Sequence, residues 1–131
     1  AFGGTAFAGS NGFTQLNFKN YVDYQYSSSV SSSLWFIVGC ANLATIRFYG
    51  RVDLGSDTNE SITFICGNPA LTDVYFYNST FVIPSTAGAL SSNNANLTIH
   101  GIANSAVQTF AENRGIPFVV ITEAELAEAG L

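Results

Sequence analysis

The residues best suited to binding a ligand recur at the ends of similar stretches of the chain. In each stretch they alternate with apolar residues, and alternate side chains of a strand point to one face. Tyr and Arg are the side chains enriched among binding hot spots, and flat aromatic rings also suit sugar rings. We therefore expect one strand face to bind a protein or a glycan. Its candidate residues are Arg47, Tyr49, Asp73, Tyr75, Tyr77 and His100. The alternative is that tyrosine serves here only as a good strand former that pairs with its neighbours.

Signals for catalysis are almost absent. His100 is the only histidine, and no Gly-x-Ser-x-Gly stretch supplies the nucleophile of a Ser–His–acid triad. The nine carboxylates share no motif, although the two carboxylates of a glycosidase can lie far apart in sequence. We expect the chain not to be an enzyme, and an enzyme that uses scattered carboxylates is the weakest of the alternatives.

Metal and cofactor sites are not indicated either. Asp53, Asp57 and Glu60 crowd one turn, but they lack EF-hand spacing, so a solvated acidic loop is expected rather than a calcium site. Cys40 and Cys66 are too few for a convincing metal site. We expect them to pack as small buried side chains, with a disulfide between neighbouring coils as the alternative. The sequence thus predicts no metal and no cofactor.

Composition narrows the class of partner. Hydrophobic residues make up 47% of the 131 residues and charged residues 10%, against about a quarter charged in an average domain. The net charge is −5 and the four basic residues are scattered, which argues against nucleic acid. No apolar run reaches the ~18 residues of a membrane-spanning helix. With so few charges, the surface must consist largely of Asn, Ser, Thr, Gly and Tyr. Such a composition is common in extracellular β-rich proteins, so we expect an extracellular or cell-surface location.

A repeating unit must position these side chains. Aligned strands have Leu16, Ile46, Val74 and Leu97 as anchors, at spacings of 30, 28 and 23 residues. Self-similarity at such a period is typical of a solenoid, in which each repeat forms one coil. The anchors would stack in one inward row. The next inward row would hold Phe18, Phe48, Phe76 and Ile99. On the outer face, Tyr49, Tyr77 and His100 would be cross-strand neighbours, with Arg47 beside Tyr75.

We expect the chain to form a single repeat domain over residues 1–131. We expect coils at about 6–36, 37–64, 65–94 and 95–104, with a Ser-rich surface loop at 27–33. The domain would be the end of a longer array, open at its N-terminal coil.

The last part of the chain changes character and predicts a cap over residues 105–131. Ser105 is a suitable N-cap for a helix over 106–114, and Gly115 is a left-handed stop. A strand rich in β-branched residues follows at 116–121. Thr122 and Glu125 then form a capping box for a final short helix. A solenoid needs such a cover over its last apolar layer.

The unit Φ-x-Gly-(Cys/Ser/Asn)-x-x-(Leu/Phe)-(Thr/Ala)-x-Φ-x-Phe resembles the leucine-rich repeat of BspA-like bacterial surface proteins. The segments 97–101 and 105–118 are similar to the closing unit of that family, and the resemblance covers about residues 6–121. It implies a β-rich α/β solenoid, a right-handed leucine-rich-repeat array with a C-terminal helix–strand–helix cap. It also implies a secreted or surface-anchored protein with an adhesive or binding role.

Two hypotheses follow. In the first, the chain is a non-catalytic adhesion module that presents the Tyr/Arg strand face to a protein or glycan. In the second, it is a structural module whose open first coil stacks on upstream repeats or another subunit of a surface, filament or virion protein.

Overall fold

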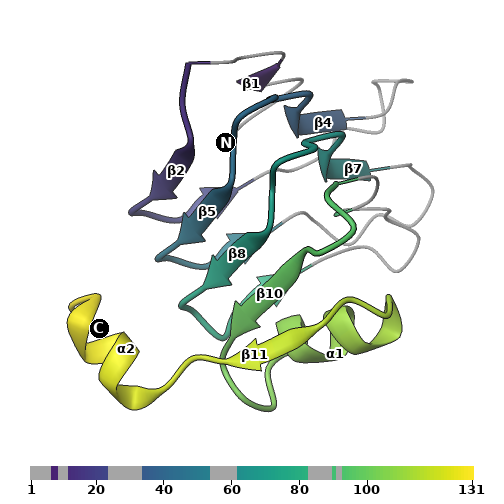
Figure 1. Cartoon of the computed structure of the whole chain (residues 1–131). Coiled ribbons are helices and arrows are strands. Elements are labelled where there is room, and N and C mark those ends of the chain that lie inside the picture. The colour runs from purple at the N-terminus through teal and green to yellow at the C-terminus, as the bar shows by residue number, and fades with distance from the viewer. Residues whose placement is uncertain (1–6, 9–11, 24–33, 54–61, 83–89, 91–92) are drawn as a thin grey trace.

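The computed structural model describes residues 7–8, 12–23, 34–53, 62–82, 90 and 93–131. Its largest element is a parallel five-stranded sheet, which we name the main sheet (Figure 1). Its strands, in spatial order, are β2 (Gln15–Phe18), β5 (Thr45–Phe48), β8 (Asp73–Phe76), β10 (Thr98–Gly101) and β11 (Phe118–Val120). The expected β-rich chain with parallel strands and few helices is confirmed at this level.

The segments between the main-sheet strands form two further parallel sheets of three strands each. One contains β1 (Phe7–Ala8), β4 (Leu34–Val38) and β7 (Ile62–Cys66). The other contains β3 (Val22–Asp23), β6 (Val52–Asp53) and β9 (Phe81–Val82). Successive segments therefore pass through the same three sheets in the same order as far as β9, whereas helix α1 (Ala106–Asn113) connects β10 to β11.

The core lies behind the main sheet, where every second side chain points inward. Ile46, Val74 and Ile99 have 0% exposure. Beside them Phe48 stacks between Phe18 and Phe76, with ring centroids 5.1 Å apart on each side. Burying a side chain of this size stabilises the fold by about 1.5–3 kcal/mol, so these rows hold the neighbouring strands in register.

The predicted register is correct for the first three strands and wrong for the fourth. Ile46 pairs with Val74 as expected, but Val74 then pairs with Ile99, not with Leu97. Leu97 instead takes the turn position of Leu71, since each donates its backbone N–H to the carbonyl three residues earlier. A shift of two residues preserves the alternation of faces, so the apolar pattern alone could not reveal it. Continuing the observed register places Gly101, not Ile99, beside Phe76.

A ladder of hydrogen bonds supports the turns that precede the strands. Cys40 N–H donates to Asn68 Oδ1 at 2.9 Å, and Asn68 Nδ2 donates to the carbonyl of Ile37 at 3.3 Å. At the next turn along the chain, Asn93 Nδ2 donates to the carbonyl of Ile65 at 3.0 Å, and Asn93 Oδ1 accepts from Asn68 Nδ2 at 3.0 Å. These amides occupy interior backbone groups that would otherwise lack partners.

The two cysteines are free in the structure. Cys40 is buried, as expected, and Cys66 is half-buried. Burial raises the pKa of the Cys66 thiol. The disulfide alternative is therefore not the state that the structure describes.

The C-terminal elements follow the prediction closely. Ser105 caps α1 (Ala106–Asn113), which buries Val107, Phe110 and Ala111 against the core. After Gly115 (φ 67°), β11 extends the main sheet by pairing with β10. The capping box of Thr122 and Glu125 then starts α2 (Glu123–Glu128), which buries none of its residues. Helix α1 and strand β11 therefore cover the core, whereas α2 does not.

Some expectations lie outside the described residues. They are the Ser-rich loop at 27–33 and, at the N-terminal end, residues 1–6 and 9–11. Within the part of the chain that the structure describes, no helix has the length and apolar character needed to cross a membrane.

Candidate functional site

The outer face of the main sheet brings the predicted binding residues together. Pairing of β5, β8 and β10 places Arg47, Tyr75 and His100 in one row across the strands. Tyr49 and Tyr77 follow the ends of β5 and β8, where their backbone N–H groups bond to the preceding strand at 2.9 Å. Because the side chains of each strand alternate, all five point away from the core.

His100 does not lie where the sequence placed it. The two-residue shift in register puts it beside Tyr75 rather than in the row of Tyr49 and Tyr77. Its imidazole stacks on the Tyr75 ring with centroids 4.1 Å apart. The expected contact between Arg47 and Tyr75 is confirmed, with the guanidinium carbon 5.2 Å from the ring centroid.

The aromatic rings cover one another's faces. Tyr75 lies between Arg47 on β5 and His100 on β10. Tyr49 lies between Tyr77, at a centroid distance of 4.8 Å, and the ammonium of Lys19, 3.8 Å from the ring centroid. Tyr49 and Tyr75 therefore have neighbours on both ring faces. The ring edges and the phenolic hydroxyls are what this surface presents.

Asp73 and His100 form a polar pair at the end of the Tyr75 row. His100 Nε2 lies 2.9 Å from Asp73 Oδ1, and the Thr72 hydroxyl donates to Asp73 Oδ2 at 2.8 Å. The His100 side chain is 15% exposed. Stacking on Tyr75 and pairing with Asp73 therefore enclose most of the ring. Among the described residues, no hydroxyl or thiol is hydrogen-bonded to this imidazole, so the pair lacks the nucleophile of a triad.

Helix α2 adds a wall that the sequence did not predict. A groove of about 240 Å³ runs between the strand face and this helix. Its lining residues are Arg47, Tyr49, Tyr75, Tyr77, Glu125, Glu128 and Ala129. In Figure 1 the chain leaves the tip of β11 and turns back to α2 on the arrowhead side of β5 and β8. Strand periodicity carries no information about where a terminal helix docks. The one signal in the sequence is charge, because α2 is acidic and Arg47 is basic.

The groove combines charges of both signs with neutral hydroxyls. Arg47 Nη1 donates to Gln15 Oε1 at 2.9 Å, and a guanidinium has five N–H groups, so further donors remain. Glu125 accepts from the Thr122 backbone within the capping box. Glu128 has no hydrogen-bond partner among the described residues. The carboxylate best placed to meet a ligand is therefore that of Glu128.

The two central tyrosines are held in their neutral form. Burial is the main cause that raises the pKa of Tyr75, and the negative charges of Asp73 and Glu125 add to it while Arg47 opposes it. Burial also raises the pKa of Tyr77, with a further contribution from Tyr49 and opposition from Arg47. Both hydroxyls can therefore donate hydrogen bonds well above neutral pH.

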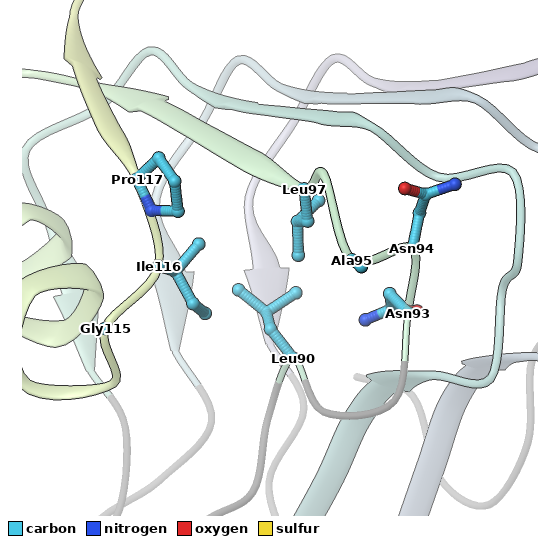
Figure 2. A pocket seen from close by; sticks show the side chains of 8 residues that line it. All are labelled: Leu90, Asn93, Asn94, Ala95, Leu97, Gly115, Ile116 and Pro117. Atoms are coloured by element: carbon cyan, nitrogen blue, oxygen red, sulfur yellow. The ribbon is translucent and has the colours of Figure 1, made fainter.

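A second cavity, of about 160 Å³, lies between the segment before β10 and the segment that joins α1 to β11 (Figure 2). Its apolar side chains Leu90, Leu97 and Ile116 point toward one another. The amides on its rim already have partners, since Asn93 belongs to the ladder and Asn94 Nδ2 donates to the carbonyl of Pro69 at 2.7 Å. This cavity offers a ligand few free polar groups.

The described residues contain no cluster of three or more His, Cys, Asp or Glu side chains that could hold a metal ion. Asp53, from the acidic turn, pairs with Arg51 at 3.3 Å, and residues 57 and 60 of that turn lie outside the described residues.

Comparison with family models, with curated proteins and with solved structures gives no match for this chain.

Proposed function

We propose that this chain is a non-catalytic binding module of an extracellular or cell-surface protein, built as a right-handed solenoid of the BspA-like leucine-rich-repeat type. Parallel strands that recur every 28 to 30 residues support the solenoid, and crossovers between parallel strands are right-handed in almost every protein. The amide ladder is the kind of support that stacked turns require.

One observation carries the binding role, namely the groove between the Tyr/Arg strand face and α2. Four of the predicted binding residues line it, and all four are half-buried rather than packed away. Half-buried Tyr and Arg side chains in a concave site are typical of the centre of a recognition surface.

The geometry favours a protein ligand over a glycan. Sugar recognition by stacking needs an open ring face, but Tyr49 and Tyr75 have neighbours on both faces. Hydroxyls, the Arg47 guanidinium and the Glu128 carboxylate are suited instead to the mixed donors and acceptors of a polypeptide. A glycan ligand is the alternative outcome of the same screen.

A binding screen tests this proposal directly. Folded protein is applied to a panel of purified extracellular-matrix proteins and to a glycan array. We expect capture by a matrix protein that is lost in the Tyr75→Ala/Tyr77→Ala double variant and weakened in Glu128→Gln. Tyr21→Ala is the matched control, because Tyr21 is 44% exposed and lies outside the groove.

Each result has a distinct meaning. If the double variant binds as well as the parent chain, the groove is not the binding site. If only glycans capture the protein, the preference for a polypeptide is wrong. If the double variant merely unfolds at lower denaturant, then the tyrosines serve the fold rather than recognition.

A structural role is the second candidate, and the β2 end of the main sheet favours it. Leu16 and Phe18 are only half-buried, whereas their partners Ile46 and Phe48 are fully buried. Among the described strands, β2 pairs with β5 alone. A further coil of the same chain or another subunit could cover this apolar edge, and Phe18→Glu would then prevent self-association of the isolated chain.

A further inference from the structure

Strand β11 is the other edge of the main sheet, and half of its backbone groups face away from the molecule. Ile99 N–H donates to the Pro117 carbonyl at 2.9 Å, and Ile121 N–H donates to the Gly101 carbonyl at 2.8 Å. Backbone groups of successive strand residues point to opposite sides. The N–H and C=O groups of Phe118 and Val120 therefore point outward, where no described residue bonds to them.

The side chains along this edge are apolar and exposed. Val119 is 48% exposed and Val120 is 45% exposed. No charged residue occurs from Gly115 to Thr122, although charge is a common means of keeping an edge strand from pairing. Pro117 does not block the edge, because its backbone faces β10. The edge is therefore open to another strand.

We propose that β11 is a self-association edge, which pairs antiparallel with β11 of a second copy around a two-fold axis at Val119. In this register Phe118 of each copy lies opposite Val120 of the other. An antiparallel pair of this type exchanges two backbone hydrogen bonds, so the two Phe118–Val120 pairs form four bonds and satisfy all four outward groups of each copy. Val119 then faces its own counterpart across the axis, as an isologous interface requires.

A second copy fits this edge better than an unstructured peptide does. The edge offers only two outward residues, and a free peptide loses conformational entropy for every residue that it orders there. The strand of a second copy is already ordered by β10. It is also uncharged, so no charge is buried on pairing.

Helix α2 leaves room for such pairing. It shares a groove with Arg47, Tyr75 and Tyr77, and in Figure 1 it lies beyond the arrowheads of β5 and β8 rather than alongside β11. The pairing strand is short, since β11 has 3 residues, whereas stable interfaces bury about 1,200–2,000 Å². We therefore expect a weak, concentration-dependent dimer.

Cysteine cross-linking of the full chain tests the register. Side chains in a pair that lacks backbone hydrogen bonds lie close together, with Cβ atoms about 4.5–5.5 Å apart, near the distance that a disulfide requires. Val119→Cys is expected to give a covalent dimer on a non-reducing gel after mild oxidation. Thr80→Cys, at an exposed position beside β9 rather than on β11, is expected to run as a monomer on the same gel, as is the parent chain with its two native cysteines.

Sedimentation velocity over a concentration series tests the association itself. We expect the mean mass of the parent chain and of the charge-matched control Thr80→Lys to rise with concentration. Val119→Lys places two like charges at the axis and should weaken association at least tenfold. Val120→Pro removes an outward N–H without touching the bonds to β10, and it should act likewise. Circular dichroism verifies the fold of each variant.

Three results would overturn the proposal. The first is a parent chain that stays monomeric throughout and gives no Val119→Cys dimer. The second is undiminished association of folded Val119→Lys and Val120→Pro. The third is association that is lost only in Phe18→Glu, which would assign self-assembly to the β2 edge. None of these results bears on ligand capture in the groove, so the binding proposal stands or falls separately.

Discussion

The two faces of the main sheet carry similar aromatic stacks in opposite surroundings. On the inner face, Phe48 stacks on Phe76 with centroids 5.1 Å apart, and both rings are buried. On the outer face, Tyr49 stacks on Tyr77 at 4.8 Å, and both rings are half-buried. A single strand register produces both stacks. Ring geometry alone therefore does not separate a residue that holds the fold from one that is free to bind.

Charge is what differs between the faces. Every cation over a main-sheet tyrosine, Lys19 or Arg47, lies on the outer face. The described contacts of the Phe48 ring are with other phenylalanine rings, including Phe64 at 5.8 Å. Burial of an inner ring contributes its full hydrophobic energy, whereas an outer ring keeps part of its surface in water. We therefore expect truncation of an inner ring to lower the free energy of unfolding more than truncation of an outer ring.

Phe48→Ala should give the largest effect. Removing this ring opens a cavity between Phe18 and Phe76, and such a change typically costs about 3–5 kcal/mol. Urea unfolding followed by circular dichroism measures the loss. Tyr49→Ala, at the next residue but on the outer face, is the matched control. A similar loss in both variants would show that the two faces contribute equally.

Asn68→Ala should come next. Asn68 has 0% exposure, and its loss leaves the backbone N–H of Cys40 and the carbonyl of Ile37 without this partner. An unsatisfied buried group costs about 1–3 kcal/mol. Urea unfolding should show a loss in this range, while Asn96→Ala, at an exposed position, should change stability little. If both variants lost the same free energy of unfolding, the hydrogen bonds of Asn68 would not contribute specifically to stability.

The inner face was largely predictable from the sequence because apolar residues alternate at a nearly constant period. The pairing of Ile46 with Val74 and of Phe48 with Phe76 follows from that period. The register of β10 did not, since a displacement by two residues leaves every side chain on its own face. Only the turn hydrogen bond of Leu97 fixes it. The same displacement misplaced His100.

The sequence predicted which residues lie on the outer face, but it did not predict the groove that they form with α2. Alternation brought Arg47, Tyr75 and Tyr77 to one face, yet nothing in their spacing revealed the wall made by α2. That helix buries no residue of its own, so no apolar periodicity marks its docking. The open edge of β11 has a visible signal, a run of β-branched residues without charge, but the same run is typical of a buried strand.

Tyr77→Ala should have a small effect on stability. Its ring stacks on Tyr49, and an aromatic pair adds about 0.5–1.5 kcal/mol beyond burial. We expect a loss within this range by urea unfolding, clearly below that of Phe76→Ala at the neighbouring position. A loss as large as that of Phe76→Ala would mean that the outer stack is part of the core, and the tyrosines would then be poor candidates for recognition.

The smallest effect should appear only at alkaline pH. Burial raises the pKa of Tyr75 and Tyr77 above the ordinary value of 10.0, so the unfolded chain releases these protons first. The folded chain then binds more protons, and stability falls as pH increases from about 10 through the folded pKa. In Tyr75→Phe/Tyr77→Phe this part of the fall should disappear. Cys66, whose raised pKa acts in the same direction, is present in both chains and cancels in the difference. Urea unfolding at pH 8 to 11 measures it, and parallel curves for the two chains would show that the tyrosines titrate as freely in the folded protein as in the unfolded chain.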